Sequence, residues 1–221
     1  MITLAIDAST YVGDVALLDG PRVLAEESVA MKGAEHERLM PAVAGILRSA
    51  SVDVGAIQRV VCGAGPGSFT SLRIAGAISK GIACGTGAPL FAIHSMALIV
   101  AGSKSMPGRY LAVVDALRGE AYVGLYDVEA DRKTTELEPP RIVSVAEIDV
   151  LAAEFDAKTI GPSRELCSVV ANPRANAVAV LEEILSAAGP VDLASWEPAY
   201  GRLAEAQVKW ESAHGRPLPA G

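Results

Sequence analysis

The residues best placed to do chemistry lie in a glycine-rich stretch from Gly63 to Ala75, where an apolar strand runs into glycines and then into a helix. A helix N-terminus presents free backbone N–H groups, which attract anions and which Ser68 can cap. Gly65, Gly67 and Ser68 are therefore candidates for binding a phosphate. Asp7, at the end of the first strand, is a further candidate. A tight turn that binds nothing is the alternative, because neither a Walker loop nor a dinucleotide fingerprint is present.

The other potential catalytic or metal-binding residues form no recognisable set. His36, His94 and His214 are far apart, and the sequence contains no His-x-x-x-His or Cys-x-x-Cys pair. Zinc and iron sites usually need such closely spaced ligands. The Gly-x-Ser-x-Gly motif of serine nucleophiles is absent as well. We therefore expect no metal site and no catalytic residue.

A segment near the N-terminus is repeated in the second half of the chain. Ile6-Asp7-Ala8 aligns with Val114-Asp115-Ala116, 108 residues further on. In both copies a strand ends in Asp-Ala, and a second strand with β-branched or aromatic residues follows a turn, which is typical of a hairpin. Two hairpins that are alike by chance are the alternative. The repeat predicts a duplicated α/β half-domain.

Hydrophobic periodicity and turn-forming residues predict the order β-β-β-α-β-α-β, which partly restarts near residue 110. The expected strands cover residues 2–7, 12–18, 22–30, 58–63, 89–93, 110–115, 120–127 and 158–161. The expected helices cover residues 35–50, 69–86, 144–155, 163–171 and 174–188. Gly, Ser, Lys and Pro gather between residues 102 and 108. We therefore expect half-domains at residues 1–104 and 105–214 and a loose tail at residues 215–221.

Composition narrows the class of protein. The chain has 221 residues, of which 51% are hydrophobic and only 5% aromatic, so the core must consist mainly of Ala, Val, Leu and Ile. The net charge of −7 and the absence of a basic run argue against a free-standing nucleic-acid binder. Three scattered cysteines are expected to be reduced. Since no leader and no membrane-spanning stretch are recognisable, we expect a cytoplasmic protein without membrane contact.

The two expected helices of the first half, residues 35–50 and 69–86, are apolar over a wider arc than one sheet face can cover. Either the second half of the chain covers them, or part of their surface binds a partner. Gly76 is of interest because a missing side chain lets helices approach closely. The candidate interface residues are His36, Leu39, Met40, Val43, Leu47, Leu72, Arg73, Gly76 and Lys80.

Five motifs together carry a family resemblance. They are Ile6-Asp7-Ala8-Ser9-Thr10, Glu35-His36, Gly65-Pro66-Gly67-Ser68-Phe69-Thr70 with Leu72-Arg73-Ile74, Val114-Asp115-Ala116 with Gly119-Glu120-Ala121-Tyr122, and Glu197-Pro198-Ala199-Tyr200. The duplicated arrangement resembles the actin, sugar-kinase and Hsp70 ATPase fold, and the motifs resemble the bacterial TsaB (YeaZ) family. Ser71 and Ala75 stand where glycines are common in that family.

The resemblance implies an accessory subunit needed to form threonylcarbamoyladenosine in tRNAs that read codons beginning with A. It implies a non-catalytic scaffold that binds and supports a TsaD homologue, works with a TsaE homologue, and forms a homodimer when alone. Contact with tRNA would come only through the complex. No cofactor is implied, although weak ATP or ADP binding stays open.

An active ATP-dependent kinase or ATPase of the actin-like fold is the alternative function. Such an enzyme generally has glycine-rich phosphate loops after both strand-end aspartates. Here the corresponding segments read Ala8-Ser9-Thr10 and Ala116-Leu117-Arg118, without a glycine. The missing glycines favour the scaffold, since a bulky side chain hinders a loop from wrapping around phosphate.

Overall fold

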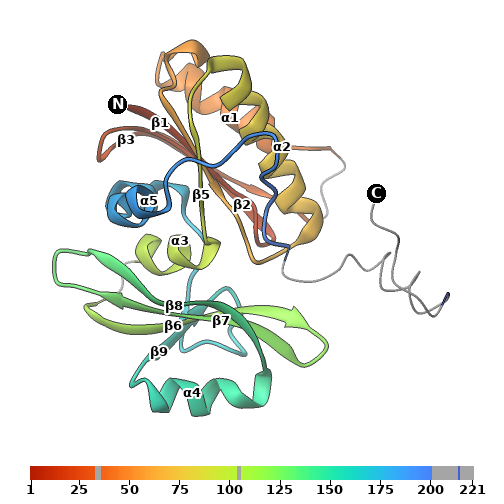
Figure 1. The fold of residues 1–221 in the computed structure, drawn as a ribbon, viewed down its shortest axis with the longest axis vertical. Coiled ribbons are helices and arrows are strands. Elements are labelled where there is room, and N and C mark those ends of the chain that lie inside the picture. Colours follow the sequence, from red (N-terminus) through yellow and green to blue (C-terminus); the bar gives the residue numbers. More distant parts are fainter. Residues whose placement is uncertain (33–35, 104–105, 201–213, 215–221) are drawn as a thin grey trace.

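The computed structural model describes residues 1–32, 36–103, 106–200 and 214, and it consists of two halves stacked along the long axis (Figure 1). The first half contains a five-stranded sheet with the order β3-β2-β1-β4-β5. Its strands are β1 (Ile2–Asp7), β2 (Val12–Asp19), β3 (Arg22–Ala30), β4 (Arg59–Gly63) and β5 (Leu90–Ile93). The first three strands are antiparallel, whereas β4 and β5 run parallel to β1.

The second half repeats this topology with another five-stranded sheet, in the order β8-β7-β6-β9-β10. Its strands are β6 (Gly108–Leu117), β7 (Glu120–Val128), β8 (Thr134–Ser144), β9 (Lys158–Gly161) and β10 (Val169–Val170). When the five strands of each half are numbered in chain order, both sheets have the spatial order 3-2-1-4-5. The predicted duplicated fold of mixed sheets flanked by helices is therefore confirmed.

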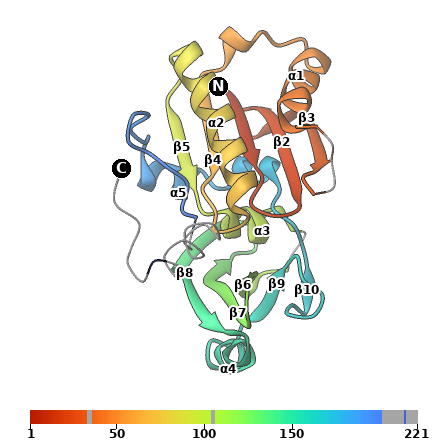
Figure 2. The ribbon, with the colours of Figure 1, turned by 90° about the vertical axis from the view of Figure 1, so that its right-hand side faces the viewer.

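Two helices cover the outer face of the first sheet (Figure 2). Helix α1 (Leu39–Ser49) buries Leu39, Ala42, Val43 and Ile46, whose spacing places them on one helix face. Helix α2 (Phe69–Thr86) packs beside it and ends where Gly87 adopts a left-handed φ of 73°. A short 3-10 helix, η1 (Val54–Ala56), lies against α2.

The other face of the first sheet packs toward the second half. Helix α3 (Ser95–Gly102) lies between the two sheets, and its residues from Ser95 to Ala101 are all buried. The 3-10 helix η3 (Ala175–Val180) and helix α5 (Glu182–Ala188) complete this layer. One hydrophobic core thus combines residues of both sheets, such as Leu18 and Val114. On the far side of the second sheet, η2 (Val145–Glu147) leads into α4 (Ile148–Glu154).

Several sequence-based element predictions were wrong. The helix expected at residues 163–171 is a loop that ends in β10, because Val169 pairs with Ile160 of β9. Residues 134–144 form β8, which was not expected, whereas the helix expected at residues 144–155 is present as η2 followed by α4. The buried helix α3 was also missed. Helix α1 begins at Leu39 rather than near residue 35, and the helix expected at residues 174–188 is divided at Leu181.

A segment that we call the strap, residues 191–200, runs back over the first half of the molecule (Figure 1). It begins where the Val191 N–H donates to the Leu90 carbonyl, at 2.8 Å, and the Ala199 N–H later donates to the Ala64 carbonyl, at 2.8 Å. The strap therefore contacts the first half, although it falls within the expected second half-domain of residues 105–214. The domain boundaries themselves stay a prediction. The expected tail, residues 215–221, lies outside the described residues.

Candidate functional site

Asp7 ends β1 with a carboxylate that is fully buried and bonded by neighbouring serines. The Ser9 N–H and hydroxyl both donate to Asp7 Oδ1 at 2.9 Å, and the Ser95 hydroxyl donates to Oδ2. Burial raises the pKa of Asp7, while the bonds from Ser95 and Ser9 act in the opposite direction. The strand-end carboxylate is therefore enclosed by protein groups.

The glycines of the loop after β4 accommodate the protein's own chain. A Cβ atom on Gly63 would lie 1.8 Å from Asp7 Oδ2, and one on Gly67 would lie 2.1 Å from the Ser9 carbonyl oxygen. Gly65 has a left-handed φ of 91°, and a Cβ there would lie 2.7 Å from the Ala199 carbonyl oxygen. These positions need glycine because the chain approaches itself so closely.

At the N-terminus of α2, the backbone amide of the N-cap residue is also bonded within the chain. The Ser68 N–H donates to the Ser9 carbonyl at 2.7 Å, so this amide already has an acceptor. Ser68 is the N-cap residue, but its hydroxyl lies 3.1 Å from the Ser71 hydroxyl and caps no backbone N–H. The expected side-chain cap is therefore wrong. The structure does bring Gly65, Gly67, Ser68 and Asp7 together, but the Ser68 N–H and the Asp7 carboxylate are bonded within the chain, and the space beside Gly65 and Gly67 is filled by it.

The corresponding hairpin of the second half is differently built. Asp115 is exposed, and its Oδ1 accepts from the Leu117 N–H at 2.7 Å. Leu117 and Arg118 have positive φ values of 64° and 59° before Gly119 completes the turn. Asp7 and Asp115 thus differ in exposure, one being enclosed and the other facing solvent. Within the described part of the chain, no group of three or more His, Cys, Asp or Glu side chains is placed to hold a metal ion.

A shallow groove lies between α1, η1 and α2, and we call it the α1–α2 groove. Its volume is about 420 Å³, and it is lined by Met40, Val54, Gly55, Ala77, Ile78, Gly81, Ile82, Gly85 and Thr86. Met40 and Val54 are 45% and 46% exposed, so two large apolar side chains meet solvent along this one groove. Beside the groove, α2 presents an exposed row that we call the α2 stripe: Thr70, Arg73, Ala77, Gly81 and Cys84.

The structure corrects several of the expected interface residues. Leu39, Val43 and Leu72 are fully buried in the protein, so they offer no side-chain surface to a partner. Gly76 is covered by the strap, since a Cβ there would lie 3.1 Å from Pro198 Cγ. Lys80 is engaged by the strap as well, donating to the Trp196 carbonyl at 3.0 Å.

The remaining candidates stay available at the surface. His36, Met40 and Arg73 are exposed, and Leu47 is half-buried. The sequence analysis missed Val54, Ala77 and Gly81, which line the groove or the stripe. The small residues of α2 were visible in the sequence, but which of them face outward depends on where the strap lies.

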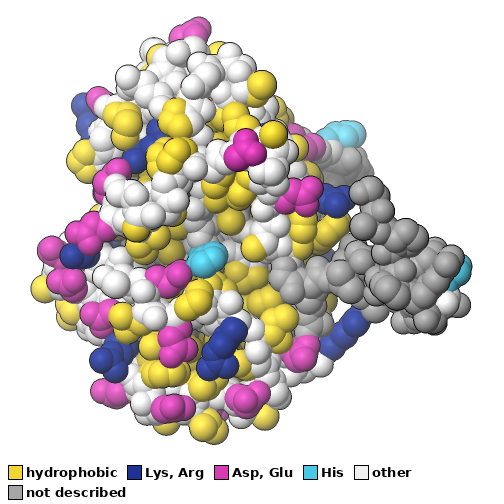
Figure 3. Space-filling view, in the orientation of Figure 1, with side chains coloured by type: hydrophobic (Ala, Val, Ile, Leu, Met, Phe, Trp, Pro, Cys, Tyr) yellow, Lys and Arg dark blue, Asp and Glu magenta, His cyan; other side chains and the backbone are white. Residues whose placement is uncertain are grey.

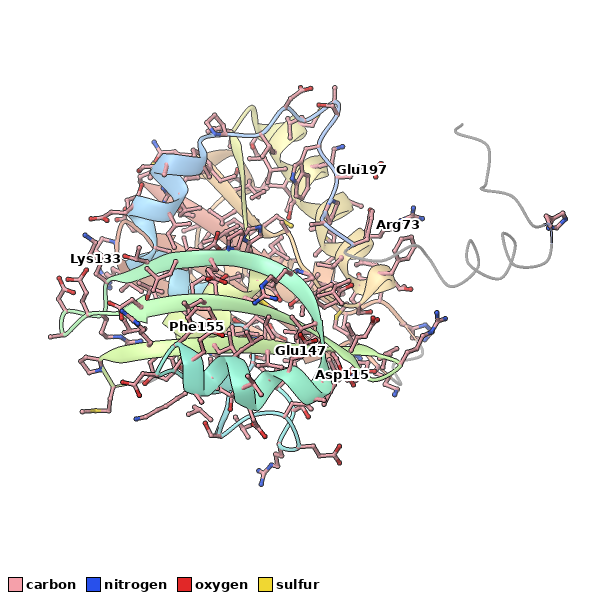
Figure 4. All side chains as sticks on the ribbon, turned by 60° about the horizontal axis from the view of Figure 1, so that its bottom comes forward. Arg73, Asp115, Lys133, Glu147, Phe155 and Glu197 are labelled. Atoms are coloured by element: carbon pink, nitrogen blue, oxygen red, sulfur yellow. The ribbon has the colours of Figure 1, made fainter. Side chains whose placement is uncertain are left out.

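Arg73, labelled in Figure 4, lies at the N-terminal end of the α2 stripe and contacts two aromatic rings. Its guanidinium carbon lies 4.3 Å from the centre of the Phe69 ring and 5.4 Å from that of Tyr200, the last residue of the strap. The two ring centres are 4.6 Å apart. Such stacking orients the guanidinium plane and leaves its N–H edge free for an acceptor.

Charge is mixed over the face shown in Figure 3, where acidic and basic side chains alternate without a continuous basic area among the residues described. No helix in residues 1–32, 36–103, 106–200 or 214 is both long and apolar enough to cross a membrane.

Comparisons with known proteins agree with this architecture. A family model described as "TsaD: tRNA N6-adenosine threonylcarbamoyltransferase" matches residues 29–156. Two relatives are named tRNA threonylcarbamoyladenosine biosynthesis protein TsaB. The one from Bacillus subtilis is 29% identical, covering 95% of this chain and 98% of the relative. The one from Escherichia coli is 34% identical, covering 57% of this chain and 55% of the relative.

Two solved structures from Pseudomonas aeruginosa share the fold. One is described as an uncharacterized protein with similarity to peptidase YeaZ; it has a TM-score of 0.78 and 24% identity, and the match covers 91% of this chain and 99% of that one. The other is YeaZ, with a TM-score of 0.75 and 23% identity, and the match covers 90% and 100% of the two chains. Since the TsaD family model matches more than half of the chain and the TsaB relative from Bacillus subtilis spans nearly all of it, the chain belongs to the TsaB (YeaZ) family.

Proposed function

We propose that this protein is a non-catalytic subunit needed for threonylcarbamoyladenosine formation in tRNA, and that it binds and supports a TsaD homologue. The names of its TsaB relatives support a role in this pathway. The matching family model supports a common origin with the transferase subunit. The proposal places the protein in the cytoplasm, with a TsaE homologue as a further partner and with tRNA reached only through the complex.

The observation that carries the non-catalytic role is the closed glycine loop. A nucleotide-hydrolysing enzyme needs backbone N–H groups and space for phosphate at such a loop. Here the Ser9 carbonyl accepts from Ser68 N and occupies the space beside Gly67, while the Asp7 carboxylate is enclosed by serines. This packing favours the subunit over the alternative kinase or ATPase, and it argues against tight ATP or ADP binding at this loop.

The α1–α2 groove supports binding of a partner. Its exposed apolar side chains, including Met40 and Val54, lie next to the small residues Ala77 and Gly81, over which another helix can approach closely. A TsaD homologue is the proposed occupant, and a second copy of this chain is the proposed occupant when that partner is absent.

The test of this role uses Ala77→Arg, which places a long charged side chain in the groove without filling the core, because Ala77 is exposed. The matched control is Ala153→Arg, an exposed alanine on α4 of the second half. Each variant is expressed in cells depleted of the wild-type protein. Co-purification of the TsaD homologue and mass spectrometry of tRNA nucleosides are then measured.

We expect Ala77→Arg to lose both the partner and the modification, and Ala153→Arg to keep both. Unchanged modification after depletion of the protein, in cells without a second gene copy, would reject the pathway. Rapid turnover of ATP by the purified chain in the presence of Mg²⁺, abolished by Asp7→Ala, would establish the alternative enzyme, since typical turnover is about 1 s⁻¹ or faster.

A further inference from the structure

The two helices that border the α1–α2 groove carry positive charge and no negative charge. Helix α1 contains Arg48, and α2 contains Arg73 and Lys80, but neither helix contains an Asp or Glu. The whole chain, by contrast, has 26 acidic residues and a net charge of −7. The proposed docking face is therefore positive on an acidic protein.

Arg73 is the cation of this face whose position is best defined. It stands in the α2 stripe one turn before Ala77, and its guanidinium stacks on Phe69 and Tyr200. Because its side chain is already ordered, binding an anion there loses less conformational entropy than ordering a free arginine would. Lys80 differs, because its ammonium group donates to the strap.

The chain supplies little to neutralise Arg73 itself. Among the described residues no carboxylate lies within ion-pair distance of it, and Glu197, on the adjacent strap, forms no ion pair with it. The first turn of α2 has no acidic residue to balance the positive end of the helix dipole. The guanidinium thus faces outward without a compensating charge in this part of the structure.

The carboxylates that flank the two helices are occupied by local bonds. Glu37 accepts from the Leu39 and Met40 N–H groups at the start of α1. Asp53 accepts from the Gly55 N–H at 2.8 Å. These bonds hold both carboxylates at the ends of the groove rather than on the outward faces of the two helices.

We infer that the α1–α2 face recognises a partner surface that carries carboxylates, and that Arg73 receives one of them. The inference rests on the proposed function, because it assumes that this face is a docking surface. A second copy of the chain is the weaker of the two proposed occupants and takes this face only when the partner is absent. Since neither helix has a carboxylate, every charged pair formed between the helices of two copies joins like charges, whatever their register. The face therefore selects an acidic partner over itself.

The two kinds of association respond to salt in opposite directions. Attraction between Arg73 and a partner carboxylate weakens as NaCl rises, since salt screens exposed charges. Repulsion between two copies weakens as well, so self-association becomes tighter. We expect the dissociation constant of the heterocomplex to rise, and that of the homodimer to fall, when NaCl is increased from 50 to 500 mM, which shortens the Debye length from about 14 Å to about 4 Å.

The experiment measures binding of the purified TsaD homologue to the full chain by calorimetry, and self-association by sedimentation equilibrium, at both salt concentrations. Arg73→Glu is compared with Arg164→Glu, which makes the same charge change at an exposed position of the second half. Arg73→Lys keeps the charge but loses the planar fork. Circular dichroism checks that each variant folds.

We expect Arg73→Glu to weaken the heterocomplex about thirtyfold or more and to reduce its salt dependence, because an attraction across the interface becomes a repulsion. Arg73→Lys should be intermediate, and Arg164→Glu should bind like the wild type. Equal effects of Arg73→Glu and Arg164→Glu, or a homodimer that weakens with salt, would overturn the inference. If Ala77→Arg also fails to affect binding, the docking face itself is wrong; if only Ala77→Arg blocks it, the face stands and the role of Arg73 falls.

Discussion

The closed glycine loop leads to a quantitative prediction for Gly67→Ala. The new Cβ would lie 2.1 Å from the Ser9 carbonyl oxygen, so the two segments must separate by ~1 Å to relieve the overlap. Overpacking of this kind costs about 1–3 kcal/mol. The separation also weakens the Ser68 N–H bond to Ser9, worth about 1 kcal/mol. We expect the free energy of unfolding to fall by about 2–4 kcal/mol in total.

The assay is urea unfolding followed by far-ultraviolet circular dichroism, at one low protein concentration so that self-association does not contribute. With a slope of about 2 kcal/mol per molar urea, the unfolding midpoint should fall by about 1–2 M. Gly81→Ala is the matched control on the same helix, because no atom lies within 4 Å of its Cβ position. Helix propensity predicts that this variant gains about 0.5–1 kcal/mol.

Opposite signs for the two glycines would support the packing of the loop against Ser9. A midpoint for Gly67→Ala that equals the wild type would refute the reasoning. It would mean that Gly67 has free space beside it, and the argument against a phosphate site at this loop would then lose its basis.

Three further predictions follow from burial and contact. Burial raises the pKa of Asp7, so the stability of the wild type relative to Asp7→Asn, measured by urea unfolding, should fall as pH rises from about 4 toward the folded-state pKa. Asp7→Asn itself should show a smaller fall than the wild type, because burial raises the pKa of Asp14 as well. Gly76→Arg should displace the strap, because the strap covers this position, and should lower the free energy of unfolding by about 2 kcal/mol or more. The melting temperature of the isolated protein should therefore fall by several degrees. An unchanged melting temperature would show that Gly76 faces outward. Iodoacetamide at pH 8 should label the exposed Cys84 and spare the buried Cys62 and Cys167, because burial raises the pKa values of these two thiols to about 12 and about 11. Mass spectrometry of the folded protein that finds Cys62 labelled would contradict this.

Local features of the fold were readable from the sequence because they depend on residues close together in the chain. The strand that ends at Asp7, the hairpin repeated around Asp115, and helix α2 from Phe69 to Thr86 each carry their own pattern of apolar, turn-forming and capping residues. The order of these local elements, together with the motifs around Gly67, was sufficient to indicate the duplicated fold and the family.

Tertiary contacts decided the remaining questions. Strand β8 was missed because Pro139 and Pro140 interrupt its sequence, and such prolines are compatible with a strand only at the edge of a sheet, where β8 lies beside β7. Helix α3 was missed because burial on all sides removes the periodic pattern of a surface helix.

The candidate site depends even more on distant parts of the chain. Whether Gly67 leaves room for a ligand depends on Ser9, 58 residues earlier, and whether Gly76 faces a partner depends on Pro198, 122 residues later. A sequence shows that a glycine permits close approach, but it does not show which atoms fill the space. The sequence by itself therefore determined most elements of the first half, the fold and the family, whereas the packing of the Ser9 turn and the strap decided that the loop is closed and which side of α2 is free.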